Sequence, residues 1–201
     1  MISWFRYFLF KRRRNRYLRQ MYIARDPWSS RLTHSLISQK INNEIGRRRF
    51  SAALDVGCGE GSFAGLLSSF ADFYLGTDVS EEALKRAVVS HPGLQFIKKD
   101  FDKLPSLRQK FDLVLFNFAL DYLGFQDHPQ HFTDHLYSFI RHCVKDDATL
   151  LIFNPVYKTE TWDRLQKYQY LLETFGFSTV KRELLATDEL QIGYLVMIKT
   201  R

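Results

Sequence analysis

The stretch LDVGCGEGSF, residues 54–63, places three glycines on alternating positions directly after a short apolar run. The apolar residues predict a buried strand that stops at Gly57, and a helix is expected to start near Ser62. The loop of such a strand–loop–helix unit lies at the carboxyl end of a parallel sheet, where open α/β folds bind ligands. Glycine lets this loop approach a ligand closely and adopt dihedral angles closed to other residues.

The glycine spacing indicates which ligands suit the loop. Dinucleotide sites use G-x-G-x-x-G, with the pyrophosphate at the helix N-terminus. Here the glycines are Gly57, Gly59 and Gly61, and Ser62 stands where the third dinucleotide glycine belongs. Glu60 would also bring a carboxylate to a pyrophosphate, which is unfavourable. The loop therefore favours a ligand without phosphate.

Strand-like and helix-like patterns alternate along the chain after residue 50. Alternation at this spacing predicts a parallel sheet with right-handed crossovers and helices on both faces. Residues 177–187 and 190–200 are β-rich with no helix between them, so they predict an antiparallel hairpin added to that sheet. The expected strands are residues 51–57, 72–79, 94–100, 111–119, 149–156, 177–187 and 190–200. We therefore expect an α/β fold: a doubly wound, seven-stranded, mostly parallel sheet with an antiparallel last strand.

Asp55 and the three glycines after it form D-x-G-x-G-x-G, which resembles the first motif of the class I S-adenosylmethionine-dependent methyltransferases. The resemblance continues in order along the chain. It implies that Asp78 binds both ribose hydroxyls, that Asp100 accepts from the adenine amino group, and that Phe101 offers a backbone amide and an apolar wall. Asn117, at the end of the fourth strand, would lie beside the methionine part of the cofactor. The implied cofactor is S-adenosyl-L-methionine, and the implied activity is methyl transfer on a Rossmann-like fold.

A finer resemblance concerns the acceptor. The D-P-W segment at residues 26–28 and the D-Y-L segment at residues 121–123 are similar to the branch that contains the nodulation-factor N-methyltransferases. It implies that Trp28 helps to close the cofactor pocket and that the acceptor is an amine or hydroxyl on a sugar. Residues 117–121 depart from that branch, which often carries a glutamate early in this segment, so the acceptor stays open.

Three side chains are candidates for a general base, which helps when the acceptor is a hydroxyl or a protonated amine. Asp121 comes first, because it follows the fourth strand at the rim where the methyl group must emerge, and His128 and His131 are the alternatives. Asp121 has a structural interpretation too, as a helix cap or a solvent contact. His131 and His135 would share a helix face as a metal pair does, but no acid supplies a third ligand, so no metal is expected.

The first twenty residues, MISWFRYFLFKRRRNRYLRQ, combine aromatic and basic side chains. Residues 1–50 hold 13 lysines and arginines against two acids, a net charge of +11, whereas residues 51–201 carry −4. We therefore predict a basic helical arm and cap over residues 1–50 and a cofactor-binding domain over residues 51–201. Three interpretations of the arm stay open: an anchor on an anionic membrane, a helix packed on its own domain, or a nucleic-acid contact.

The functional hypothesis is methyl transfer to an oxygen or nitrogen atom of an acceptor that is small, lipid-linked or glycan-linked. The reaction would take place at a membrane surface or away from one. An RNA methyltransferase and a non-catalytic cofactor-binding scaffold are the alternatives. Nucleic acid is disfavoured, because Asn117 is followed by Phe118 and Ala119 and not by the N-P-P-[YF] signature of base-amine methyltransferases. The two cysteines have no paired spacing, which indicates a reducing compartment. We therefore expect the protein in the cytoplasm, either free or associated with a membrane.

Overall fold

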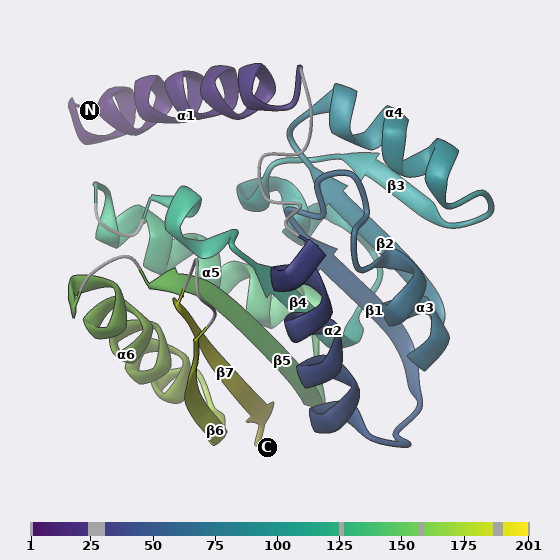
Figure 1. The fold of residues 1–201 in the computed structure, drawn as a ribbon. Coiled ribbons are helices and arrows are strands. Elements are labelled where there is room, and N and C mark those ends of the chain that lie inside the picture. Colours follow the sequence, from purple (N-terminus) through teal and green to yellow (C-terminus); the bar gives the residue numbers. More distant parts are fainter. Residues whose placement is uncertain (1, 24–30, 125–126, 157–158, 187–190, 201) are drawn as a thin grey trace.

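A computed structural model describes residues 2–23, 31–124, 127–156, 159–186 and 191–200. Within them, one seven-stranded sheet runs through the molecule in the order β3-β2-β1-β4-β5-β7-β6 (Figure 1). The strands are β1 Phe50–Val56, β2 Ala71–Asp78, β3 Gln95–Lys98, β4 Phe111–Asn117, β5 Val144–Val156, β6 Phe177–Ala186 and β7 Gln191–Lys199.

Helices cover the sheet and its carboxyl edge (Figure 1). They are α1 Ile2–Met21, α2 Arg31–Ile45, α3 Ala64–Phe70, α4 Glu81–Ser90, α5 Pro129–Cys143 and α6 Thr159–Thr174, with the short 3-10 helices η1 Phe101–Ser106 and η2 Leu120–Leu123. The start of α4 follows from its sequence: Ser80 Oγ accepts a hydrogen bond from the Ala83 amide, and two glutamates occupy the first turn. Among the helices described, none is long and apolar enough to cross a membrane.

The pairing of the strands confirms the predicted fold class. Strands β1 to β5 pair in parallel, whereas β7 lies between β5 and β6 and is antiparallel to both. Strand β1 is central, with β2 and then β3 on one side of it and β4 and then β5 on the other. The order in which successive strands are added to the sheet therefore reverses beside β1. A crevice forms outside the carboxyl ends of the strands at such a reversal.

Side chains that alternate along the strands build two apolar layers, one on each face of the sheet. Leu54 and Val114 point to the layer that contains Phe139 from α5 and Leu165 from α6. Their neighbours in sequence point to the opposite layer, which contains Ile41 from α2 and residues of α3. These layers hold β1 and β4 rigidly from both sides, so that the residues at their carboxyl ends are fixed in position.

Helix α1 lies across the carboxyl edge of the sheet and not alongside its faces (Figure 1). Tyr7 and Arg14 are buried on its inner side, at a spacing that places them on one helix face, and Tyr22, directly after the helix, is buried too. Of the three interpretations of the arm, a helix packed on its own domain therefore describes this side of α1. The opposite side is exposed.

Candidate functional site

The glycine loop turns sharply between β1 and α3. Gly57, Gly59 and Gly61 have φ angles of +74°, +55° and +79°, values that other residues rarely adopt. A Cβ atom on Gly59 would lie 2.7 Å from Tyr22 Oη, so the loop also needs glycine for close packing under α1. The helix after the loop begins at Ala64, two residues later than expected, because the chain first completes a series of turns.

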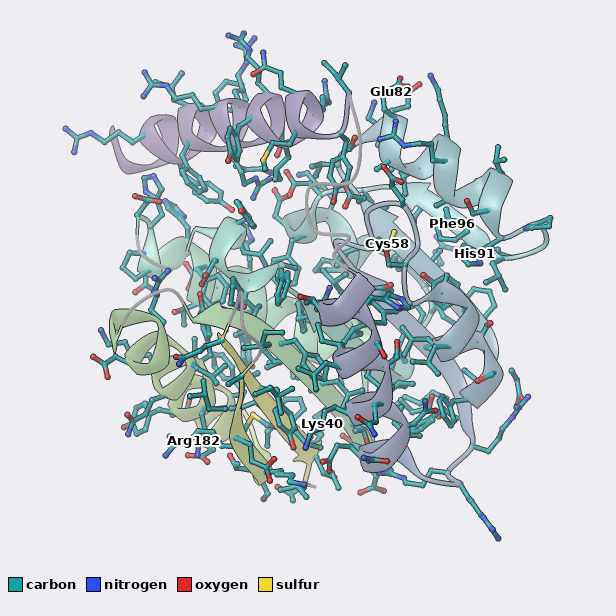
Figure 2. All side chains as sticks on the ribbon, viewed as in Figure 1. Lys40, Cys58, Glu82, His91, Phe96 and Arg182 are labelled. Atoms are coloured by element: carbon teal, nitrogen blue, oxygen red, sulfur yellow. The ribbon has the colours of Figure 1, made fainter. Side chains whose placement is uncertain are left out.

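Gly61 is needed for close packing beside the loop, and its predicted role in cofactor binding stays a prediction. A Cβ atom there would lie 3.1 Å from the His91 ring and 3.2 Å from the Phe96 ring. Figure 2 shows these two rings near each other, on the side of the loop away from α1. Gly57 and Gly59 line the pocket described below, but Gly61 is not among the described residues that do so.

One pocket lies at the carboxyl ends of β1, β2 and β4, at the place where the strand order reverses. The strands contribute polar side chains, and α1 covers the pocket on the side away from the sheet. The lining includes Asp55, Asp78 and Asn117 from the strands, Arg14 and Leu18 from α1, and Tyr22 just after α1. The strand residues were predicted, but the other three were not.

Asp78 ends β2 and is held in a fixed position. Its Oδ2 accepts a hydrogen bond from the Gly59 amide at 3.0 Å, and its Oδ1 accepts one from the Ser80 amide at 2.7 Å. The carboxylate therefore connects the glycine loop to the start of α4 while it also lines the pocket. A carboxylate offers about four acceptor positions, which suits a ligand that presents two hydroxyls.

Asp55 lies deeper, below the loop. It is buried, and Tyr74 Oη donates a hydrogen bond to its Oδ2 at 3.3 Å. Burial raises the pKa of Asp55 to about 7, the Tyr74 hydroxyl opposes this rise, and the charge of Asp78 adds to it. A positively charged ligand group near Asp55 would offset the cost of its buried charge.

Asp100 follows β3 by two residues and caps η1, accepting from the Phe101 amide at 2.8 Å. The prediction that it ends the third strand is wrong in this detail, because β3 stops at Lys98. Arg14 Nη2 lies 2.7 Å from both of its carboxylate oxygens, Lys11 Nζ lies 3.1 Å from Oδ2, and Asn15 Nδ2 lies 3.3 Å from Oδ2. Burial alone would raise the pKa of Asp100, but Arg14 and Lys11 hold it below its ordinary value.

These contacts make Asp100 the anchor of α1. Arg14 is 8% exposed, and it also donates to the Tyr122 carbonyl at 3.2 Å, so it joins α1 to η1 and η2. Asp100 therefore already shares its carboxylate among four donor groups. Any ligand amino group that used the same carboxylate would have to share it with Arg14.

A second set of contacts fixes the other end of α1. Arg86 on α4 donates to the Tyr22 carbonyl and pairs with Glu60 of the glycine loop at 2.7 Å. Glu60 is thus used in an ion pair beside the loop. Helix α1 is held at both ends of the pocket, over Asp100 and over the glycine loop.

Asn117 and Phe101 complete the predicted cofactor residues in the described part of the chain. Both line the pocket. Asn117 Oδ1 is buried and accepts no hydrogen bond from a described residue, whereas the Phe101 ring packs against Phe116 and Phe139. An unused buried acceptor that faces a pocket indicates a ligand with a donor group. Trp28 lies outside the described residues.

Asp121, the first base candidate, is directed away from the pocket. Asn154 Nδ2 and Tyr168 Oη donate to its Oδ1 at 2.9 and 3.0 Å, and Arg164 Nη1 lies 3.4 Å from its Oδ2. It is not among the described residues that line the pocket, although its neighbour Tyr122 is. Asp121 therefore joins η2 to β5 and α6, and its role as a base stays a prediction.

The histidines at the start of α5 lie below the first half of α1. The Tyr7 ring stacks on His131 at 4.6 Å and on His135 at 5.4 Å, and it meets the edge of His128 at 5.5 Å. Burial lowers the pKa of His135, and burial and Asp102 raise the pKa of the Tyr7 hydroxyl. The described pocket lining includes neither His128 nor His131, so their use as a base also stays a prediction. The described residues contain no group of three or more side chains that could hold a metal ion.

We expect Asp121→Ala to lower the free energy of unfolding by about 1–3 kcal/mol, because Asn154 and Tyr168 lose their acceptor in a partly buried place. Thermal unfolding of the variant measures this loss. A base role requires in addition that the near-isosteric Asp121→Asn lowers turnover by roughly 10²–10⁴-fold. If Asp121→Ala unfolds at the same temperature as the unaltered protein, Asp121 does not join η2 to β5 and α6 in the way its contacts indicate.

The comparisons with known proteins agree with this geometry. A protein-family profile described as "Methyltransferase domain" matches residues 53–142, which run from β1 through the glycine loop almost to the end of α5. The matched segment is less than half of the 201 residues. The sheet, with the antiparallel β7 between β5 and β6, has the predicted fold of the class I methyltransferases.

The individual proteins to which the chain is similar are distant relatives. Malonyl-[acyl-carrier protein] O-methyltransferase of Hamiltonella defensa subsp. Acyrthosiphon pisum (strain 5AT) is 31% identical over 102 residues, which are 46% of this chain and 40% of that protein. The chain thus aligns with less than half of the length of this curated relative. Two solved structures are similar in fold over most of the chain.

The first is 1,6-didemethyltoxoflavin-N1-methyltransferase of Burkholderia thailandensis, with a TM-score of 0.70, 18% identity, and 94% of this chain and 87% of that chain covered. The second is the N-methyltransferase NodS of Bradyrhizobium japonicum WM9, with a TM-score of 0.66, 17% identity, and 85% and 87% covered. Both were solved with S-adenosylhomocysteine. At these identities the likeness concerns the fold.

Proposed function

We propose that the protein is an S-adenosylmethionine-dependent methyltransferase that acts on an oxygen or nitrogen of a small or lipid- or glycan-linked acceptor. The observation that carries the proposal is that Asp78, Asn117 and the glycine loop surround one pocket at the reversal of the strand order. The profile match over residues 53–142 supports the same activity. The cofactor is the one present, as its demethylated product, in the two solved neighbours.

The residues of the pocket fit this cofactor in three respects. Gly57 and Gly59 leave a cradle beside Ala119 and Tyr22 that a Cβ atom would fill. Asp78 presents a fixed carboxylate for paired hydroxyls. Asn117 Oδ1 is an unused buried acceptor, and the buried Asp55 carboxyl group supplies negative charge nearby. A cationic ligand with a ribose satisfies all of these groups.

When bound, S-adenosylmethionine would supply a methyl group on a positively charged sulfur, which would keep the bonding electrons when an acceptor lone pair took the methyl group. The chain has to hold the acceptor in line and exclude water, because orientation supplies most of the acceleration in such a reaction. Helix α1, fixed at Arg14 and Tyr22, excludes water from above. The acceptor's proton leaves to solvent or to a base.

The acceptor has to fit the remaining walls of the pocket. Leu18, Ile37, Phe118 and Leu123 make this part apolar, and Arg14 and Lys99 are cationic residues of the pocket lining. These walls favour an acceptor with an apolar body near the reacting atom. The curated relative is by name an O-methyltransferase and the two solved neighbours are N-methyltransferases, so both acceptor atoms are kept in the proposal.

Incubation with methyl-labelled S-adenosylmethionine and fractionated cell extract tests this function. We expect label in a lipid, glycan or small-molecule fraction, and none with Asp78→Ala. Label that enters RNA instead would make the protein an RNA methyltransferase. Tight binding of S-adenosylhomocysteine without transfer into any fraction would contradict the catalytic proposal and leave a cofactor-binding scaffold.

A further inference from the structure

The outer side of α1 combines positive charge with large apolar side chains. Its exposed arginines are interspersed with exposed apolar residues; Phe8, Leu9, Tyr17 and Ile23, the last just after the helix, are 49%, 39%, 50% and 70% exposed. The exposed arginines on this side are Arg6, Arg12, Arg13, Arg16 and Arg19. Figure 2 shows long side chains that extend from α1 away from the domain.

Four of these five arginines form no ion pair within the described part of the chain, whereas Arg19 lies near enough to Glu81 of α4 to interact with its carboxylate. Lys11 and Arg14, on the inner side, pair with Asp100, whereas Arg6, Arg12, Arg13 and Arg16 form no ion pair with a described residue. Arg12 instead lies over the Phe8 ring, 5.7 Å from its centre. Four like charges without an ion pair on one helix face repel one another, so an anionic partner that binds all of them is favoured.

The charge of the whole chain would orient such a partner. Residues 1–50 carry +11 and residues 51–201 carry −4, so an extended anionic surface attracts α1 and repels the rest of the molecule. Leu9 and Ile23 distinguish between the possible anionic partners. Aliphatic side chains cannot stack on bases as aromatic ones can, but they do insert at the boundary between headgroups and acyl chains.

We propose that the outer side of α1 binds the surface of an anionic lipid bilayer, with α1 parallel to that surface. Its arginines would pair with headgroup phosphates, and its apolar side chains would insert between the headgroups. Because the inner side of the same helix closes the pocket, binding leaves the contacts of Arg14 and Tyr22 intact. The inference rests on the exposed side chains of α1 and does not require the methyl-transfer proposal.

This arrangement places the pocket one helix away from the headgroups. An α-helix with its side chains is about 10–12 Å across, so the opening beside α1 would lie within the reach of a lipid-linked acceptor. The apolar pocket walls formed by Leu18 and Leu123 are in keeping with such an acceptor. Membrane binding would thereby concentrate the enzyme where this class of acceptor is found.

Sedimentation with vesicles tests the proposal in the full-length protein. The variant Arg12→Gln/Arg13→Gln/Arg16→Gln removes three charges from the outer side of α1 and keeps good helix formers. The matched control, Arg47→Gln/Arg108→Gln/Lys110→Gln, removes three exposed charges elsewhere. Vesicles contain either phosphatidylcholine alone or an equal mixture with phosphatidylglycerol. Far-UV circular dichroism and thermal unfolding show that each variant is folded.

We expect the unaltered protein to bind the mixed vesicles, the α1 variant to bind them about 100-fold more weakly, and the control to change less than fivefold. Replacing Leu9 by serine should weaken binding further. The proposal is overturned if the protein ignores the mixed vesicles, if both charge variants lose binding equally, or if single-stranded RNA is bound more tightly than the vesicles. Loss of label transfer with vesicle binding retained would instead count against the proposed function alone.

Discussion

In Asp78→Ala, S-adenosylhomocysteine is expected to leave the melting temperature within about 1 °C of the ligand-free value. In the unaltered protein, ligand at about 100 times its Kd should raise that temperature by roughly 5–10 °C, since it contributes about 2.7 kcal/mol. The ribose hydroxyls lose their charged acceptor in the variant. Two hydrogen bonds to a charged group are worth roughly 3–6 kcal/mol, which corresponds to about 10²–10⁴-fold in Kd.

Asp112 provides a matched control for this measurement. Like Asp78 it accepts from two backbone amides, those of Ser51 at 3.0 Å and Ala52 at 2.8 Å, but it lies at the start of β4 and away from the pocket. Asp112→Ala should therefore lose stability through the same kind of contact and keep the full response to S-adenosylhomocysteine. An undiminished response in Asp78→Ala would show that the ribose site is elsewhere.

The second large effect is expected at the anchor of α1. Asp100→Ala leaves the buried Arg14 guanidinium without its carboxylate, which should lower the free energy of unfolding by about 3–5 kcal/mol, the usual cost of breaking a buried pair. Trypsin should then cleave rapidly after the arginines of α1, because the helix no longer holds to the domain. Denaturant unfolding and a timed digest measure the two effects.

The exposed pair Arg49–Asp72 is the corresponding control. Its nitrogen–oxygen distance of 2.8 Å is close to the 2.7 Å of the Arg14–Asp100 pair, but its side chains are 62% and 68% exposed. Asp72→Ala should therefore cost no more than about 1 kcal/mol and leave trypsin cleavage of α1 unchanged. Equal losses in Asp72→Ala and Asp100→Ala would mean that Asp100 does not anchor the helix.

Features that depend on neighbours in sequence could be predicted well. The glycine loop, Asp78 and Asn117 lie at strand ends because an apolar run stops at each of them. The hairpin of β6 and β7 follows from two β-rich runs with no helix between them. In each case, local pattern and sheet geometry act in the same direction, so the sequence alone was sufficient.

Features that depend on distant partners could not be predicted. Arg14 stands in a run of basic residues that is typical of a solvated surface, and only Asp100, 86 positions away, makes it a buried anchor. Asp121 follows a strand end where a base is expected, but Asn154 and Tyr168, 33 and 47 positions away, hold it outside the pocket. The spacing of Tyr7 and Arg14 was the signal that could have indicated an inner face of α1.

Because Asp55 is buried below the glycine loop, both the stability of the protein and ligand binding at this loop should depend on pH. The Asp55 pKa of about 7 in the folded protein exceeds the value of about 3.9 in an unfolded chain, so the folded state binds the extra proton between these values. The stability that this proton contributes is therefore complete below about pH 4 and is lost as the pH rises toward 7. A ligand that brings positive charge to Asp55 expels the same proton, so its affinity should increase with pH even where the ligand itself does not titrate.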